Sequence, residues 1–156
     1  MGYRIKKAAV LGAGVMGQGI AAHLANAGIP SLLYDMVHEK GRSELAIRGI
    51  ENAKKLKPAA FYHKDFASRI TPANYEDDAD KLQECDLIIE VVVERLDIKR
   101  KVFRALAAVN PPRLHRSLRE IFSEGVFDQD AEIRLSAVHG LRSIKDPRVL
   151  DIMSVL

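Results

Sequence analysis

Three apolar runs, separated by segments of helical periodicity, dominate the pattern along the chain. They span residues 5–11, 29–34 and 86–94 and are rich in aliphatic side chains, so each predicts a buried strand. After the first run, apolar residues recur at helical spacing until Gly28, which is expected to end the helix. Strands that alternate with helices predict an α/β fold built on a parallel sheet, with strands at 5–11, 30–35 and 87–93.

Further elements follow from the same patterns. Residues 37–56 predict a helix that is charged on one side and ends before Lys57 and Pro58. A short strand is expected at 69–71 and a short helix at 77–84. An amphipathic helix is expected over 95–109, with Leu96, Val102, Phe103 and Leu106 facing inward.

A glycine pattern lies where the first strand meets the first helix. Gly12, Gly14 and Gly17 have the G-x-G-x-x-G spacing of a dinucleotide-binding turn. The first glycine allows the tight turn, the second lets the backbone approach a pyrophosphate, and the third lets helix and strand pack closely. The start of the helix would offer unpaired N–H groups to phosphate oxygens. Asp35 ends the second apolar run about twenty residues further on, where an acid meets the adenosine ribose. With no adjacent Arg, this acid favours NAD over NADP.

Glu90 is an anomaly inside the third apolar run, which predicts a parallel strand buried on both faces. A carboxylate at such a position needs a buried partner or lies near a ligand, and the sequence leaves both possibilities open. The carboxyl end of the strand points at the ligand crevice of an α/β sheet, which places Glu94 near a bound cofactor.

Composition narrows the function classes. The chain has 156 residues, is 47% hydrophobic and carries a formal charge of +3, which suits a globular protein and gives no basis for nucleic-acid binding. Its single cysteine, Cys85, excludes an internal disulfide and fits a reducing, cytoplasmic setting. No stretch is long and apolar enough to span a membrane. No spacing of His, Cys or acids supports a metal site.

The 37–56 helix ends in basic residues, for which two interpretations stand. They are Arg48, Lys54, Lys55 and Lys57. Such a run is usually a solvated helix face. The functional alternative is a landing site for the phosphates of an anionic substrate such as a coenzyme A ester.

Residues 4–109 resemble the NAD-binding domain of the 3-hydroxyacyl-CoA dehydrogenases of fatty-acid β-oxidation. The matching segments are 6–17, 19–21, 57–61, 69–72 and 86–96, together with Lys99. The resemblance implies that Val15 and Met16, with the three glycines, lie under the pyrophosphate and that Asp35 holds the ribose. It also implies that Val91, Glu94 and Lys99 line the nicotinamide side.

The family's reaction passes a hydride from a 3-hydroxyacyl-CoA to NAD, while a His oriented by a Glu takes the hydroxyl proton. After residues 110–112 the family pattern that carries this His and Glu does not follow. No catalytic residue is therefore predicted, and the expected function is NAD binding without turnover. The alternative is an interaction or scaffold module in which the nucleotide turn is vestigial.

The last part of the chain has a different pattern. Residues 114–122 predict one helix, and 128–156 predict two helices that resemble a HEAT-type repeat. Their apolar stripes are Ile133, Ala137, Val138 and Leu141, then Val149, Leu150, Met153 and Leu156. We therefore predict a Rossmann-type segment at 1–110 and a helical segment at 113–156, joined naturally or artificially as a chimera. The alternative is a degenerate natural homologue that has lost its catalytic half. The strands missing from the sheet would leave an open edge, which is prone to pairing with other chains. Either the helical segment covers this edge, or a second copy of the chain pairs with it. On the second ground we predict a homodimer.

Overall fold

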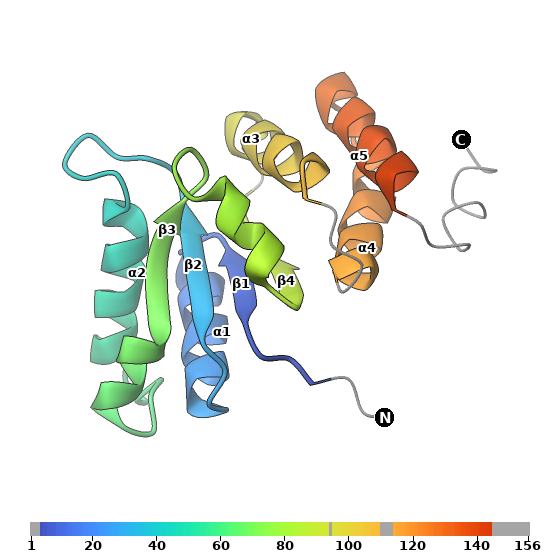
Figure 1. Ribbon diagram of the computed structural model, residues 1–156. Helices are drawn as coiled ribbons and strands as arrows, with labels where there is room; N and C mark the ends of the chain where they lie inside the picture. The colour runs from blue at the N-terminus through green and yellow to red at the C-terminus, as the bar shows by residue number, and fades with distance from the viewer. Residues whose placement is uncertain (1–3, 94, 110–113, 145–156) are drawn as a thin grey trace.

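The sheet is built from short apolar strands that all run in the same direction. The computed structural model describes residues 4–93, 95–109 and 114–144 of the chain. Within these residues the strands are β1 (Ala8–Leu11), β2 (Ser31–Asp35), β3 (Ile70–Asn74) and β4 (Leu87–Glu90). They form one parallel sheet in the order β3-β2-β1-β4, so β1 and β2 are its inner strands (Figure 1). The predicted α/β fold with C-terminal helices is confirmed.

Helices cover both faces of this sheet. The α-helices are α1 (Val15–Asn26), α2 (Glu44–Lys55), α3 (Leu96–Ala107), α4 (His115–Gly125) and α5 (Ala131–Ser143), and the 3-10 helices are η1 (Lys64–Arg69) and η2 (Ala79–Glu84). One apolar core lies between the sheet and α1, α2 and η1. A second core lies on the opposite face, against η2 and α3 to α5. The connections through α1 and α2 therefore lie on one face of the sheet, and the connection through η2 lies on the other.

Three predicted elements need correction. The sheet contains the 70–74 strand as a full member, in addition to the three strands expected. The predicted 37–56 helix begins only at Glu44, because residues 38–41 form a tight turn in which Gly41 donates to the His38 carbonyl at 3.1 Å. The third apolar run is a short outer strand with half-buried residues, not a strand buried on both faces.

The inward face of α3 also differs from the prediction at one position. Val102, Phe103 and Leu106 are buried as expected, but Leu96 is 53% exposed. The helix instead buries Ile98 on the same face as Val102 and Leu106, at four-residue spacing. Leu96 lies two residues away from this stripe and faces solvent at the start of the helix.

The C-terminal helices share a core with the sheet. Leu11 and Tyr34 of the inner strands belong to the same buried cluster as Leu118, Phe122 and Ile133. Of the apolar stripe predicted on α5, Ile133, Ala137 and Leu141 are buried, and Val138 packs at the edge of the cluster. The second predicted stripe, at 149–156, lies outside the described residues. The division of the chain at 110–113 and the HEAT-like pattern stay predictions.

Ion pairs join α3 to residues 128–132, at the start of α5. Three basic residues of α3 pair with three acids, as Lys99–Asp128, Arg100–Asp130 and Arg104–Glu132. Asp130 also caps α5 by accepting from the backbone N–H groups of Glu132 and Ile133. The Arg100 guanidinium and these N–H donors lower the pKa of Asp130 to about 2. The acid is therefore ionised across the neutral range, where it keeps both its cap and its ion pair.

The outer edge of β4 is partly covered by α4. The N–H of Val91 donates inward to the Leu11 carbonyl at 2.9 Å, so strand alternation turns the N–H of Ile88 outward. That N–H donates to Ser117 Oγ of α4 at 3.4 Å in a buried position. The sequence left two possible covers for the open edge, the helical segment or a second copy of the chain. The structure shows the helical segment against β4.

The other outer strand, β3, is protected by its own sequence. Pro72 has no N–H, and the N–H groups two residues to either side are taken by the Ala67 carbonyl and the Asp78 carboxylate. A strand whose outward donors are blocked in this way is a poor template for pairing with another chain. The predicted homodimer stays a prediction.

Candidate functional site

A crevice is expected where the strand connections change face. The chain leaves β1 for α1 on one face, and β4 lies on the other side of β1 with its following helix on the opposite face. At such a point in a parallel sheet the loops after the two strands diverge, and ligands bind at the carboxyl ends between them. The turn after β1 holds the three glycines of the motif, and the turn after β4 is residues 91–93.

Two of the glycines are required by close backbone contacts. Gly12 has φ +111°, a left-handed conformation, and a Cβ there would lie 2.7 Å from the carbonyl oxygen of Val91. A Cβ on Gly17 would lie 1.7 Å from the carbonyl oxygen of Gly12. The turn after β1 is therefore pressed between the turn after β4 and the first turn of α1. No side chain other than hydrogen fits at either position.

Gly14 has a different environment. A Cβ at this position would meet nothing within 4 Å, so the space beside it is open. Gly14 is also the N-cap of α1 and supplies no side-chain hydrogen bond to the helix. The first N–H groups of the helix have no carbonyl four residues earlier within it, and they carry the positive end of its dipole. An open, side-chain-free helix start of this kind suits phosphate oxygens.

Val15 and Met16 begin α1 with their side chains in solvent. They are 79% and 69% exposed, which is high for apolar side chains. Val91 is half-buried, and its Cγ2 would lie 3.4 Å from a Cβ on Gly17. The structure thus brings Val15, Met16 and Val91 around the glycine turn.

Asp35, at the end of β2, is tied to the same turn. Its Oδ2 accepts from the backbone N–H of Ala13 at 2.9 Å, and its Oδ1 accepts from the N–H of Met36 at 2.7 Å. Asp35 is half-buried, so part of the residue remains accessible to solvent. Each carboxylate oxygen has a second lone pair, and these can accept from ribose hydroxyls. The bond to Ala13 has no signature in the sequence, because its donor is a backbone group.

Lys99, which was predicted to line the nicotinamide side, takes part in an ion pair. Lys99 Nζ pairs with Asp128 Oδ2 at 3.1 Å, and both side chains are less than a fifth exposed. Lys99 lines a hollow of about 380 Å³ together with Leu96, Phe127, Asp128 and Gln129. A residue of the α4–α5 connection therefore holds this cation. Glu94 lies outside the described residues.

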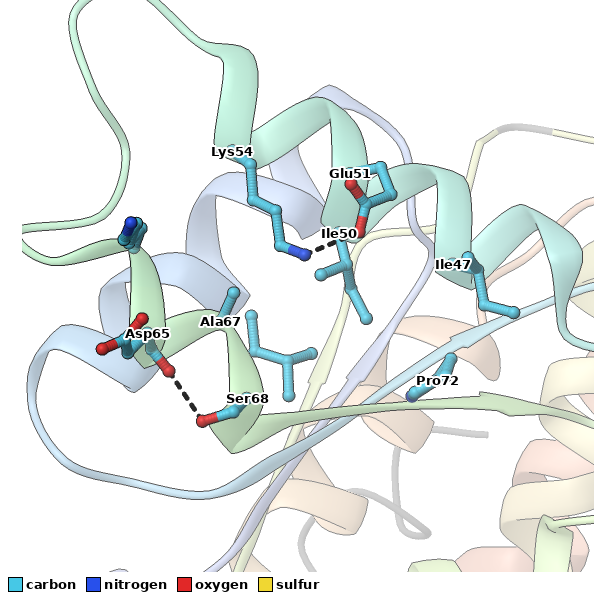
Figure 2. A pocket seen from close by; sticks show the side chains of 10 residues that line it. Ile47, Ile50, Glu51, Lys54, Asp65, Ala67, Ser68 and Pro72 are labelled. Atoms are coloured by element: carbon cyan, nitrogen blue, oxygen red, sulfur yellow. Dashed lines mark hydrogen bonds and ion pairs between the residues drawn. The ribbon is translucent and has the colours of Figure 1, made fainter.

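Figure 2 shows a second hollow, at the outer edge of the sheet. It measures about 370 Å³ and is formed by α2, η1 and the first half of β3, away from the carboxyl ends of the strands. Ile50 and Ile70 line it, and Lys54 at its rim donates to Glu51 at 2.6 Å. Arg48 likewise pairs with Glu44. Two of the four basic residues considered for a coenzyme A ester are thus neutralised by acids of their own helix.

The residues present fit a dinucleotide at the crevice. The backbone of the glycine turn leaves no room for side chains at Gly12 and Gly17, the helix start is open, and a carboxylate stands at the end of β2. Those features together define a dinucleotide-binding domain of the Rossmann type. Among the described residues, no helix has both the length and the hydropathy that a membrane span requires.

Comparison with known proteins identifies the kind of dinucleotide domain. Residues 7–114 match the family described as 3-hydroxyacyl-CoA dehydrogenase, NAD binding domain, and the chain belongs to this family. NAD is accordingly the cofactor of the domain.

Individual relatives agree with this assignment. A probable 3-hydroxyacyl-CoA dehydrogenase of Bacillus subtilis is 51% identical over 115 residues, covering 64% of this chain and 15% of that protein. One of Deinococcus radiodurans is 49% identical over 108 residues, covering 68% and 31%. The crystal structure of 3-hydroxybutyryl-CoA dehydrogenase from Escherichia coli superposes with a TM-score of 0.51 at 32% identity, covering 71% of this chain and 24% of that chain.

The chain spans less than a third of the length of these relatives, and the matched part is their NAD-binding part. The comparisons give no support to a chimera or to a scaffold role.

Proposed function

We propose that this chain binds NAD(H) across the glycine turn, with Gly12, Gly14 and Gly17 around the pyrophosphate and Asp35 on the adenosine ribose. The observation that carries the proposal is the contact of three backbone segments at the crevice. The turn after β1 touches the turn after β4 through Gly12 and the start of α1 through Gly17. Val15, Met16 and Val91 surround the same point, and we assign them to the cofactor as well.

NAD supplies the hydride acceptor in this family, and the residues of this chain would bind and orient it. The backbone N–H groups at the start of α1 would hold the phosphates, and Asp35 would fix the ribose through its free lone pairs. Because Asp35 also holds the N–H of Ala13, the same carboxylate shapes the turn and contacts the ligand. For Glu94 and Lys99 a place on the nicotinamide side remains a proposal. For Lys99 it requires that the ammonium group contact the ligand while it is paired with Asp128.

A titration with NADH, followed by its fluorescence, tests the role of Asp35. The variant Asp35→Asn keeps the size of the side chain but loses its charge. We expect NADH to bind about tenfold more weakly, because a hydrogen bond to a charged group contributes roughly 1.5–3 kcal/mol. NADPH, whose phosphate is repelled by Asp35, should bind no worse to the variant than to the parent protein.

The matched control for this titration is Asp80→Asn, an exposed acid outside the crevice, which should leave both affinities unchanged. Equal weakening of NADH and NADPH in Asp35→Asn would mean that Asp35 acts only on the fold of the turn. Absence of saturable NADH binding by the parent chain would contradict the proposed function itself.

Oxidation of a 3-hydroxyacyl-CoA by this chain alone is expected to be undetectable. In the family, a His oriented by a Glu takes the proton, and the part of the family pattern that carries them does not follow residue 112 of this sequence. The measurement is NADH formation at 340 nm from 3-hydroxybutyryl-CoA and NAD, with a complete dehydrogenase as the positive control. Turnover by the purified chain that is lost in Gly12→Val would contradict this expectation. The acyl-CoA ester and a second copy of the chain remain proposed partners.

A further inference from the structure

The turn after β4 forms one wall of the crevice through its backbone. A Cβ on Gly12 would lie 2.7 Å from the carbonyl oxygen of Val91 and 3.2 Å from the Cα of Val92. The glycine turn and residues 91–93 are therefore in direct contact, so a shift of one displaces the other.

Residues 91–93 are held by hydrogen bonds of two kinds. The N–H of Val91 continues the ladder to Leu11 at 2.9 Å, and the carbonyl of Val93 accepts from the N–H of Arg95 at 2.7 Å. Between them, the N–H of Val92 donates to Oε1 of Glu90 at 2.7 Å. The first two bonds belong to the backbone and do not depend on side-chain identity. The third depends on a carboxylate at the last residue of the strand.

Glu90 and Asp35 are the last residues of β4 and β2, the two strands that neighbour β1. Leu11 pairs with Glu90 on one side and with Tyr34, the residue before Asp35, on the other, so the two carboxylates lie on either side of the end of β1. Asp35 holds the turn after β1 through Ala13, and Glu90 holds the turn after β4 through Val92. Both acids also act on Tyr75, since their charges add to burial in raising the pKa of its hydroxyl.

We propose that Glu90 is a positioning residue of the dinucleotide site, which fixes residues 91–93 against the glycine turn by accepting from the N–H of Val92. The inference rests on the proposed function, because it assigns the turn to NAD(H). It also resolves the choice left open by the sequence. Glu90 has a backbone partner and lies beside the crevice, and it acts on the ligand through the turn.

Amide exchange of the ligand-free protein tests whether Glu90 holds the turn. In Glu90→Ala the N–H of Val92 loses its acceptor, and we expect its exchange with deuterium, followed by NMR, to accelerate by roughly tenfold or more. Glu90→Gln keeps an acceptor oxygen at the same place, so its exchange rate should stay near that of the parent. Glu51→Ala is the matched control, because it removes an exposed acid that pairs with Lys54 on α2 (Figure 2).

NADH titrations of the same three variants test the consequence for the ligand. We expect about a tenfold weaker affinity for Glu90→Ala, rescue to within about threefold by Glu90→Gln, and no change for Glu51→Ala. The inference is overturned if Val92 exchanges equally fast in the parent and in Glu90→Ala. It is also overturned if exchange accelerates while NADH binds as before, or if Glu90→Gln fails to restore binding. Failure of the parent chain to bind NADH would instead show that the proposed function is wrong.

Discussion

Gly17→Ala should destabilise the protein by about 3 kcal/mol and reduce NADH affinity more than tenfold. The added methyl carbon would lie 1.7 Å from the Gly12 carbonyl oxygen and 2.8 Å from its carbon. Because both atoms belong to the backbone, no side chain can rotate away, and α1 must move off the turn. That movement separates the helix start from Gly12 and spoils the arrangement of N–H groups. Urea unfolding followed by circular dichroism and an NADH titration measure the two effects.

Gly19→Ala is the matched control for this prediction. It makes the same change two residues further along α1, where a Cβ would meet nothing within 4 Å. Since Ala is the better helix former, this variant should gain about 0.5–1 kcal/mol and bind NADH normally. Similar stability and similar affinity in the two variants would show that the contact between Gly17 and Gly12 does not govern the turn.

The glycine turn was predictable because its backbone geometry restricts particular positions to one residue type. Only glycine tolerates the φ of +111° at Gly12 and the contact at Gly17, so the spacing of the motif reports the backbone directly. Asp35 was predictable as the acid that ends the second strand. Its bond to Ala13 was not, because any residue supplies a backbone N–H.

The outer strands show where periodicity stops being informative. The run containing Glu90 has the apolar composition of a central strand. Its side chains point alternately into the two cores, so both faces of the strand need apolar residues even though it is an outer strand. Whether a further strand lies beside it depends on distant residues, and here Ser117 of α4 meets Ile88. The pairing of Lys99 with Asp128 is likewise a tertiary contact between positions 29 residues apart, which no local pattern encodes.

Phe122→Ala is expected to lower the free energy of unfolding by about 3–5 kcal/mol and to destabilise the sheet together with the C-terminal helices. Phe122 is fully buried in the cluster that also contains Leu11 and Tyr34 of the inner strands. Its ring packs 6.0 Å from that of Phe103, centroid to centroid, and a Cβ on Gly140 would come within 2.3 Å of it. The cavity left by the ring therefore lies where α3, α4 and α5 meet.

Two signals followed during thermal unfolding decide whether this core is one cooperative unit. Far-ultraviolet circular dichroism follows all the helices, and near-ultraviolet dichroism of the tyrosines includes Tyr34 and Tyr75, which stack at 5.6 Å beside the sheet. Both transitions should shift down together. Phe127→Ala, the same change at a 66% exposed position between α4 and α5, should have little effect on either. An unshifted tyrosine transition in Phe122→Ala would show that the C-terminal helices unfold independently of the sheet, and that the shared core does not couple them.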